Sequence, residues 1–191
     1  MSRLKNRYHE AVKPELQKKF SYRNPMLIPS LKKVVINMGI AEVGKDKNAL
    51  QDCVNELAQI AGQQPVICRA KKSISNFKLR EGMPIGVKVT LRGSRMWDFL
   101  DRFYNITSPR IRDFRGFKPG GDKKGNMNIG LDDHTVFPEL NLDKVKVTKG
   151  MNITFVTSSQ TDDECIELLR LLGCPFKNHD VVVVQSASGG V

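Results

Sequence analysis

The chain has 191 residues, and its 31 Lys and Arg outnumber its 20 Asp and Glu, so the formal net charge is +11 at pH 7. A chain of this size can bury a core without disulfides or metals, and it is too short for two full domains. The basic excess predicts a polyanionic partner such as nucleic acid, and no apolar run is long enough to span a membrane.

The first residues, MSRLKNRYHE, lack the apolar stretch of a secretory signal, so we expect a cytoplasmic protein. The cysteines are scattered and form no C-x-x-C pair; they are Cys53, Cys68, Cys165 and Cys174. Because ligand pairs at close spacing are missing, we expect reduced, mostly buried thiols and no metal or cofactor.

The N-terminal third predicts a helix, a strand and a second helix. Apolar residues recur every four positions among basic ones, which predicts an amphipathic helix over about 3–20 that Pro14 breaks. Its inward residues are Leu4, Tyr8, Val12 and Leu16. Alternation predicts a strand over 32–43, and a helix capped by Asp46 then runs to about Ala61, with Gly62 as its stop.

The stretch from Arg69 to Arg95 carries the strongest functional signal. It holds eight Lys and Arg against one acid, a net charge of +7. A strand over 66–70 enters it, and a second strand alternates Val87, Val89 and Leu91 with outward cations and a hydroxyl. The loop between these strands is long and basic, and loops of this length in compact domains are usually functional or disordered.

The remaining elements are a helix, two strands and a final helix. Ser94 is expected to cap the third helix, whose inward side includes Trp97, and Pro109 to end it. A second basic segment follows and leads into strands over 126–131 and 151–155. Thr161 and Glu164 form a capping box at the start of the last helix. Whether residues 181–184 form an edge strand is left open.

This order of elements predicts an α+β fold, an antiparallel or mixed sheet with helices on one face. The opposite face collects cations, hydroxyls and amides, which suit contacts with phosphates and 2′-hydroxyls. We expect one domain over 1–178, with a core from 30 to 177, and a flexible extension over 179–191. Three basic blocks alternate with neutral or acidic ones. They are residues 1–33, with nine Lys and Arg against two acids, residues 69–95, with eight against one, and residues 110–124, with six against two. This alternation is typical of a protein with one binding side.

Patterns for catalysis are weak. Gly116 and Gly121 have the spacing of a phosphate-binding loop, but Asp122 stands where that loop requires Lys. The neighbours Asp132, Asp133 and His134 are expected to form a solvated turn rather than an acid–base site. An RNA-modifying enzyme, another kind of basic RNA-binding protein and a duplex-DNA binder are the alternatives. Phe77 is expected either to stack on a base or to pack inside its own loop.

Several segments, in this order and spacing, resemble one known family. They are LKKVVINMGIAE, AGQQPVICRAKKSISNFKLREGMPIGVKVTLRG, MWDFLDRF, SPRIRDFRG, GNMNIGL and FPEL. The resemblance, from about Tyr8 to Lys177, is to the bacterial large-subunit ribosomal protein five family, the 5S-rRNA-binding proteins of the central protuberance. The chain departs from the family pattern after Asn178.

The resemblance implies a non-enzymatic protein that binds 5S rRNA, touches 23S rRNA and neighbours other proteins of the central protuberance. A loop over 72–83 would approach the elbow of the P-site tRNA. A further loop, either 109–125 or 134–149, would meet a protein of the small-subunit head.

Three sets of candidate residues follow. The expected rRNA contacts are Asn37, Met38, Gly39, Gln63, Arg69, Lys71, Lys88, Thr90, Arg92 and Arg95. The expected tRNA-proximal residues are Lys72, Ser73, Ser75, Asn76, Phe77, Lys78 and Arg80. The second basic loop contributes Arg110, Arg112, Arg115, Lys118, Lys123 and Lys124.

Overall fold

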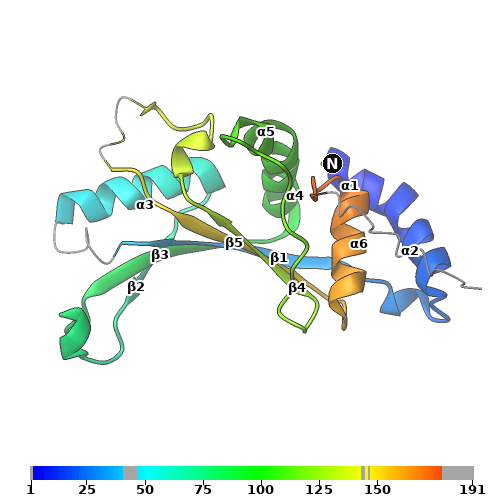
Figure 1. Ribbon diagram of the computed structural model, residues 1–191, viewed down its shortest axis with the longest axis horizontal. Coiled ribbons are helices and arrows are strands. Elements are labelled where there is room, and N and C mark those ends of the chain that lie inside the picture. Colours follow the sequence, from blue (N-terminus) through cyan, green and yellow to red (C-terminus); the bar gives the residue numbers. More distant parts are fainter. Residues whose placement is uncertain (1, 41–46, 143–144, 146, 178–191) are drawn as a thin grey trace, which may run out of the picture.

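The protein is described by a computed structural model that covers residues 2–40, 47–142, 145 and 147–177. A five-stranded sheet runs through the molecule, with α3 and α4 on one of its faces (Figure 1). The predicted cap Asp46, the predicted strand end over 41–43 and the undecided segment 181–184 lie outside the described residues. In the part that is described, no helix is long and apolar enough to cross a membrane.

All strand pairs are antiparallel, in the order β2-β3-β1-β5-β4. The strands are β1 (Leu31–Gly39), β2 (Val66–Arg69), β3 (Pro84–Leu91), β4 (Asn126–Leu131) and β5 (Met151–Thr157). Apolar residues alternate with polar ones along them, and one set is buried, including Ile36, Val87 and Ile153 at 2% exposure or less. The predicted α+β class with an antiparallel sheet is confirmed.

The helices cover the buried side of this sheet. They include α3 (Lys47–Ala61), α4 (Gly93–Arg102), η4 (Phe103–Thr107), α5 (Ser108–Arg110) and α6 (Asp162–Leu172). Aromatic rings fill the space between helices and sheet, with Phe103 against Phe99, Phe117 and Phe155. Trp97 is buried, as predicted.

The N-terminal helix forms in three joined parts, α1 (Arg3–Arg7), η1 (Tyr8–Val12) and α2 (Lys13–Phe20). Its four predicted inward residues are all buried. The middle part is a π-helical turn, whose wider winding keeps side chains spaced four apart on one face. Pro14 lies in the first turn of α2, so a new helical segment starts there as predicted, although the backbone stays helical across the junction with η1.

Two expectations about α4 are wrong. The helix begins at Gly93, and the cap position is held by Arg92, whose side chain makes no capping hydrogen bond, so Ser94 is not the cap. Gly93 has a φ of 59°, which lets the chain turn directly from β3 into the helix. The helical path also continues through η4 and past Pro109 to Arg110.

The last helix, α6, has the predicted capping box. Thr161 and Glu164 exchange side chain to backbone bonds, and Gly173 ends the helix with a φ of 102°. The N-terminal helix is fastened to α6, because Tyr22 donates a 2.5 Å hydrogen bond to Glu164 and Lys19 pairs with Glu167 at 2.7 Å.

Candidate nucleic-acid interface

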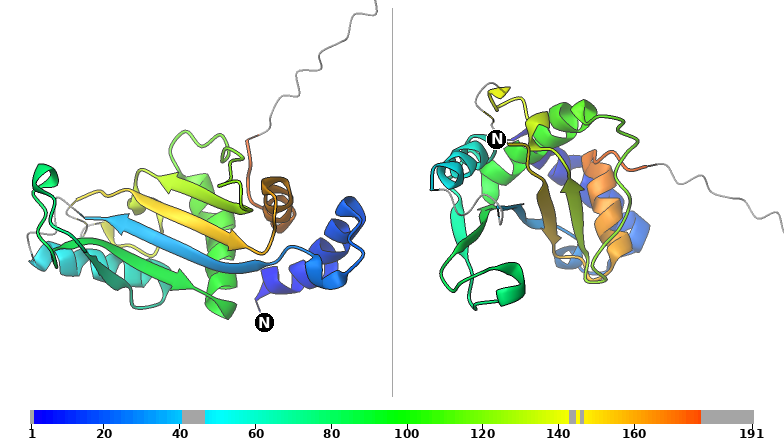
Figure 2. Two further views of the ribbon diagram at one scale, coloured as in Figure 1. Left: turned by 90° about the horizontal axis from the view of Figure 1, so that it is seen from below. Right: turned by 60° about the vertical axis from the view of Figure 1, so that its left-hand side comes forward.

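The helix-free face of the sheet, called here the open face, presents its polar residues in rows. Seen from below, the strands lie in front of α3 and α4 (Figure 2, left). The central row crosses all five strands in register and consists of Val66, Lys88, Asn37, Asn152 and Gly130. A second row consists of Thr90, Val35, Thr154 and Asn128. The strand register therefore brings the predicted residues Asn37, Lys88 and Thr90 together.

The open face carries cations without compensating acids. The five strands contain Lys32, Lys33, Arg69 and Lys88 but not one Asp or Glu. Lys88 and the following Arg92 are exposed. Amides and hydroxyls fill the remaining polar positions, and Thr154 donates a 2.6 Å bond to Asn128. Such a surface offers donors to phosphate and ribose oxygens and no negative charge to repel them.

Glycine makes part of the open face flat. Gly39 lies opposite Gly86 on the neighbouring strand. A Cβ at Gly39 would meet no atom within 4 Å, whereas one at Gly86 would lie 3.1 Å from the Met38 carbonyl oxygen. A side chain at Gly86 would therefore crowd the neighbouring strand. Gly39 leaves free space that a ligand backbone can approach closely.

Gln63 and Arg95, both predicted contacts, meet at one end of β3. Arg95 donates a 3.3 Å hydrogen bond to the Gln63 side-chain oxygen, and Gln63 donates to the Thr90 carbonyl oxygen, also at 3.3 Å. Gln63 is half-buried, while Arg95 is exposed. Gln63 therefore orients Arg95 and ties it to the edge of the open face.

One predicted rRNA contact needs correction. The Met38 side chain is fully buried in the core, because β1 alternates and turns Asn37 and Gly39 to the other face; the prediction that included this side chain is wrong. Arg69 lies beyond a register shift at the end of β2, and its guanidinium donates a 3.0 Å bond to the Gly82 carbonyl oxygen. It thus braces the base of the following loop. Its side chain is nevertheless exposed, as is that of Lys71, so both stay predicted rRNA contacts.

The hairpin loop, residues 70–83, projects away from the body of the protein (Figure 1). Its backbone is organised by hydrogen bonds in both directions between Ile74 and Leu79, each 3.1 Å, and by the Ala70–Met83 bond of 2.8 Å. A short 3-10 turn, η3 (Ser75–Phe77), forms the tip. The Ser73 hydroxyl accepts the Glu81 N–H at 3.0 Å. The loop is therefore an ordered extension of the β2–β3 hairpin.

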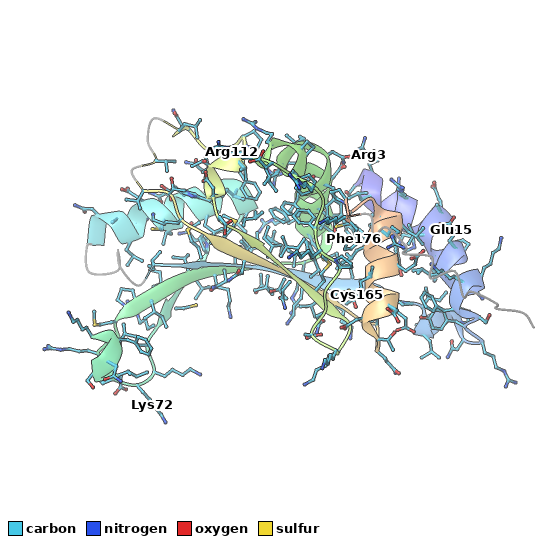
Figure 3. The ribbon with its side chains drawn as sticks, viewed as in Figure 1. Arg3, Glu15, Lys72, Arg112, Cys165 and Phe176 are labelled. Atoms are coloured by element: carbon cyan, nitrogen blue, oxygen red, sulfur yellow. The ribbon has the colours of Figure 1, made fainter. Side chains whose placement is uncertain are left out.

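The side chains at the tip of the hairpin loop face solvent. Phe77 is 72% exposed, so it does not pack inside its own loop. The other exposed members are Lys71, Lys72, Ser73, Ser75, Asn76, Lys78 and Arg80. Lys72 points away from the rest of the molecule (Figure 3). An exposed aromatic ring among cations is suited to a nucleotide partner.

The second basic segment, residues 110–125, is divided between two sides of the molecule. Arg112 lies on the helix side, remote from the hairpin loop (Figure 3). Further along, Asp162 accepts backbone N–H groups of Lys123 and Gly125 at 3.0 and 3.1 Å and fixes the turn that enters β4. All six predicted cations of this segment are exposed: Arg110, Arg112, Arg115, Lys118, Lys123 and Lys124. They do not form one continuous patch with the open face.

A cleft of about 610 Å³ lies on the helix side. One wall is formed by residues 110–118, and the other by residues 130–133, Thr135 and Val136, with Lys177 at the margin. The two segments between which the sequence left the small-subunit contact open therefore border the same cleft.

The structure also shows a buried polar cluster that the sequence did not predict. His134 is fully buried, and its Nε2 lies 3.3 Å from Oε2 of Glu56 on α3. Lys149 Nζ lies 3.6 Å from the same oxygen and 2.8 Å from Cys53 Sγ. The expected solvated turn is therefore wrong for His134. This cluster joins α3 to the β4–β5 connection and is remote from the open face.

Comparisons with known proteins agree with this architecture. Residues 24–80 match the family described as ribosomal protein L5, and residues 84–176 match the model of that family's C-terminus. The chain is 68% identical over 183 residues to large ribosomal subunit protein uL5 of Protochlamydia amoebophila, which covers 96% of this chain and 99% of that protein.

The same similarity extends to other species. The uL5 proteins of Chlamydia pneumoniae and Chlamydia trachomatis serovar L2 are 59% and 60% identical over 177 residues, which is 93% of this chain and 98% of each relative. Identity this high over nearly the whole length means that the chain belongs to the ribosomal L5 family, and it is a structural, non-enzymatic protein of the large ribosomal subunit in the cytoplasm.

Proposed function

We propose that the protein binds 5S rRNA through its open face and helps attach it to 23S rRNA in the central protuberance. The observation that carries this proposal is the row of Lys88, Asn37 and Asn152 on a sheet face that has cations and no carboxylates. Gly39 adds a flat position where an RNA backbone fits. The bound RNA would neutralise charges that the protein leaves unpaired.

The open face favours folded RNA over single strands. Proteins that bind single strands on a sheet stack bases on outward aromatic rings. Phe155 is the only aromatic residue in the five strands, and it is buried. The available groups are short amides, hydroxyls and cations, which recognise phosphate and ribose rather than base faces.

We propose further that the hairpin loop approaches the P-site tRNA. The loop projects beyond the RNA-binding sheet and presents the Phe77 ring with Lys72, Lys78 and Arg80 around it. Because its backbone is already ordered by internal hydrogen bonds, contact with tRNA would require little further ordering.

The contact with a small-subunit head protein is assigned here to the cleft between residues 110–118 and 130–136. Its walls hold more basic than acidic side chains, with Arg110, Arg112, Arg115, Lys118 and Lys177 against Asp113, Asp132 and Asp133, and they include apolar residues such as Phe114 and Val136. A protein surface with acidic and apolar groups would complement this mixture. Neighbouring proteins of the central protuberance are further candidates for this side.

The main proposal is tested by measuring 5S rRNA affinity at several salt concentrations. If phosphate contacts dominate, the logarithm of the binding constant should fall linearly with the logarithm of salt concentration, by about 0.9 per contact. The variant Lys88→Ala/Arg92→Ala should bind more weakly, with a shallower slope and an unchanged Tm. Arg170→Ala/Lys177→Ala removes the same charge from exposed positions on and after α6 and should bind like the parent. Salt-independent binding, or equal losses in both variants, would refute the assignment to the open face.

A further inference from the structure

Two large apolar side chains are exposed side by side in the connection between α2 and β1. Met26 is 87% exposed and Leu27 is 58% exposed, whereas the next residue, Ile28, is buried at 4%. Single exposed apolar residues are ordinary on protein surfaces. Here two adjacent ones occupy the same turn, η2 (Pro25–Leu27).

The exposure is imposed by an ordered backbone. The Asn24 side chain accepts the Met26 N–H at 2.9 Å, and the Asn24 carbonyl oxygen accepts the Leu27 N–H at 3.0 Å. Pro25 fixes its own φ inside this turn. The apolar turn, residues 24–28, therefore holds its two side chains outward before any partner binds.

The chain on the C-terminal side of the turn is anchored in the protein. The Tyr8 hydroxyl donates a buried 3.0 Å bond to the Pro29 carbonyl oxygen. Ser30 and Ser158 exchange bonds of 2.8 and 2.9 Å between neighbouring strands. A rigid turn cannot fold its apolar side chains back onto the core, so an external surface must cover them if they are to leave water.

The surroundings of the apolar turn are cationic. Arg23 and Lys32 flank it and are exposed, and residues 1–33 hold nine Lys and Arg against two acids. The turn leads into β1, at the opposite end of the sheet from the hairpin loop (Figures 1 and 2). The open face thus ends in an aromatic, basic loop on one side and an apolar, basic turn on the other.

Two apolar side chains between cations fit one ligand better than the alternatives. An unstacked RNA base presents an apolar face flanked by phosphates, and proteins commonly place apolar side chains against such bases. A stable protein–protein interface involves about 20–30 residues on each side, whereas the two apolar side chains here are flanked by cations, which favours a polyanionic ligand.

We propose that Met26 and Leu27 pack against an unstacked rRNA base at the second end of the open face, with Arg23 and Lys32 on the adjoining phosphates. This inference rests on the proposed function, because it assigns a further contact of the same interface. It makes the apolar turn a contact that does not depend on charge, next to others that do.

The test compares apolar and cationic substitutions in the full-length protein. Met26→Ser/Leu27→Ser should lower affinity about tenfold for the RNA that holds the base, with an unchanged salt slope. Arg23→Ala should instead reduce the slope by about 0.9. Met26→Phe should bind the same RNA at least as tightly as the parent does, since an aromatic ring stacks on a base better than a methionine side chain. The probes are a 5S rRNA transcript and a transcript of the 23S rRNA region that binds the 5S particle.

The control is Ile106→Ser, which removes an apolar side chain that is 47% exposed in η4. It should leave affinity for both RNAs unchanged. Chemical probing should show one base that is protected by the parent and reactive with the double serine variant. Parent-like binding of both RNAs by that variant overturns the inference, and if the variant then fails to enter large subunits, the turn contacts a protein instead. Failure of the parent itself to bind 5S rRNA would overturn the proposed function separately.

Discussion

Lys88 lies directly opposite Asn37 across the β1–β3 ladder, and both side chains belong to the face of the sheet that has no helix. Their strand neighbours Val87 and Met38 are fully buried on the other face. Adjacent residues in one strand therefore have separate roles: one of each pair stabilises the core, and the other is free to bind. This separation makes stability and RNA binding independently testable.

Asn37→Ala and Met38→Ala form a matched pair of neighbouring substitutions. Met38→Ala should lower the free energy of unfolding by about 2–5 kcal/mol, because it leaves a cavity among buried side chains. Asn37→Ala should change stability by less than about 0.5 kcal/mol but weaken 5S rRNA binding. Urea denaturation and RNA titration of both variants measure the two effects. The opposite pattern would mean that the strand faces are reversed.

The hairpin loop can be shortened without disturbing the sheet. Ile74 and Leu79 bond to each other in both directions, so residues 75–78 can be replaced by Asn-Gly, which favours a two-residue hairpin turn. The variant should keep its Tm, because the tip contributes no buried side chain. We expect nearly unchanged 5S rRNA affinity but weaker P-site tRNA binding by ribosomes that carry the variant.

Loss of 5S rRNA affinity in that variant, equal in size to the loss of tRNA binding, would place the loop in the rRNA interface. Phe77→Ala alone should reproduce part of the tRNA effect. Phe77→Tyr, which keeps the ring, should behave like the parent.

The buried pair of Glu56 and Lys149 gives a third prediction. Their side chains are 11% and 8% exposed, so Glu56→Leu leaves a buried ammonium group without its carboxylate. We expect this variant to lose about 3–5 kcal/mol of stability. The double variant Glu56→Leu/Lys149→Met should recover part of the loss, since it removes both charges but still leaves the buried His134 without Glu56. A double-mutant cycle by urea denaturation measures this, and additive losses would show that the two groups are not coupled.

The Tyr22–Glu164 hydrogen bond gives a pH dependence. Burial alone would raise the pKa of Glu164, but bonds from Tyr22 and from the Gln160 and Thr161 N–H groups outweigh it and lower that pKa below its ordinary value of 4.5. A carboxyl group with a depressed pKa stabilises the fold above its unfolded pKa, and that stability is lost as pH falls through the folded value.

The parent should therefore be more stable than Tyr22→Phe by a constant amount near neutral pH. This difference in stability should shrink as the pH falls below about 4.5, because protonation of Glu164 removes the charged acceptor of the Tyr22 hydrogen bond. Denaturation midpoints measured between neutral and acidic pH test this. A difference that grew on acidification would assign the bond to the protonated carboxyl group. Phe20→Leu, a substitution near Tyr22 that leaves the bond in place, serves as the control.

Local patterns were enough to predict most elements of this fold. The alternation in β1, β3 and β5 identified which residues face the core, and the Thr161–Glu164 capping box located the start of α6. These features depend on residues within a few positions of one another. The same applies to Gly62, whose φ of 64° ends α3 as expected.

The sequence could not predict features that depend on distant partners. His134 is buried because Glu56 and Lys149 meet it from elsewhere in the chain, and nothing beside it signals this. Met38 was assigned to the interface although its own strand pattern turns it inward. The cleft required the fold itself, because its walls combine residues 110–118 with residues 130–133, Thr135 and Val136, which only the folded chain brings together.

The carboxylate-free sheet has a consequence for the protein before assembly. A copy that has not been assembled into a ribosome carries uncompensated positive charge on its open face, and any nucleic acid in the cell can neutralise that charge. Surplus chains would therefore occupy messenger and transfer RNA indiscriminately. Matching the supply of this protein to that of its rRNA is, on electrostatic grounds, a requirement for keeping other RNAs free.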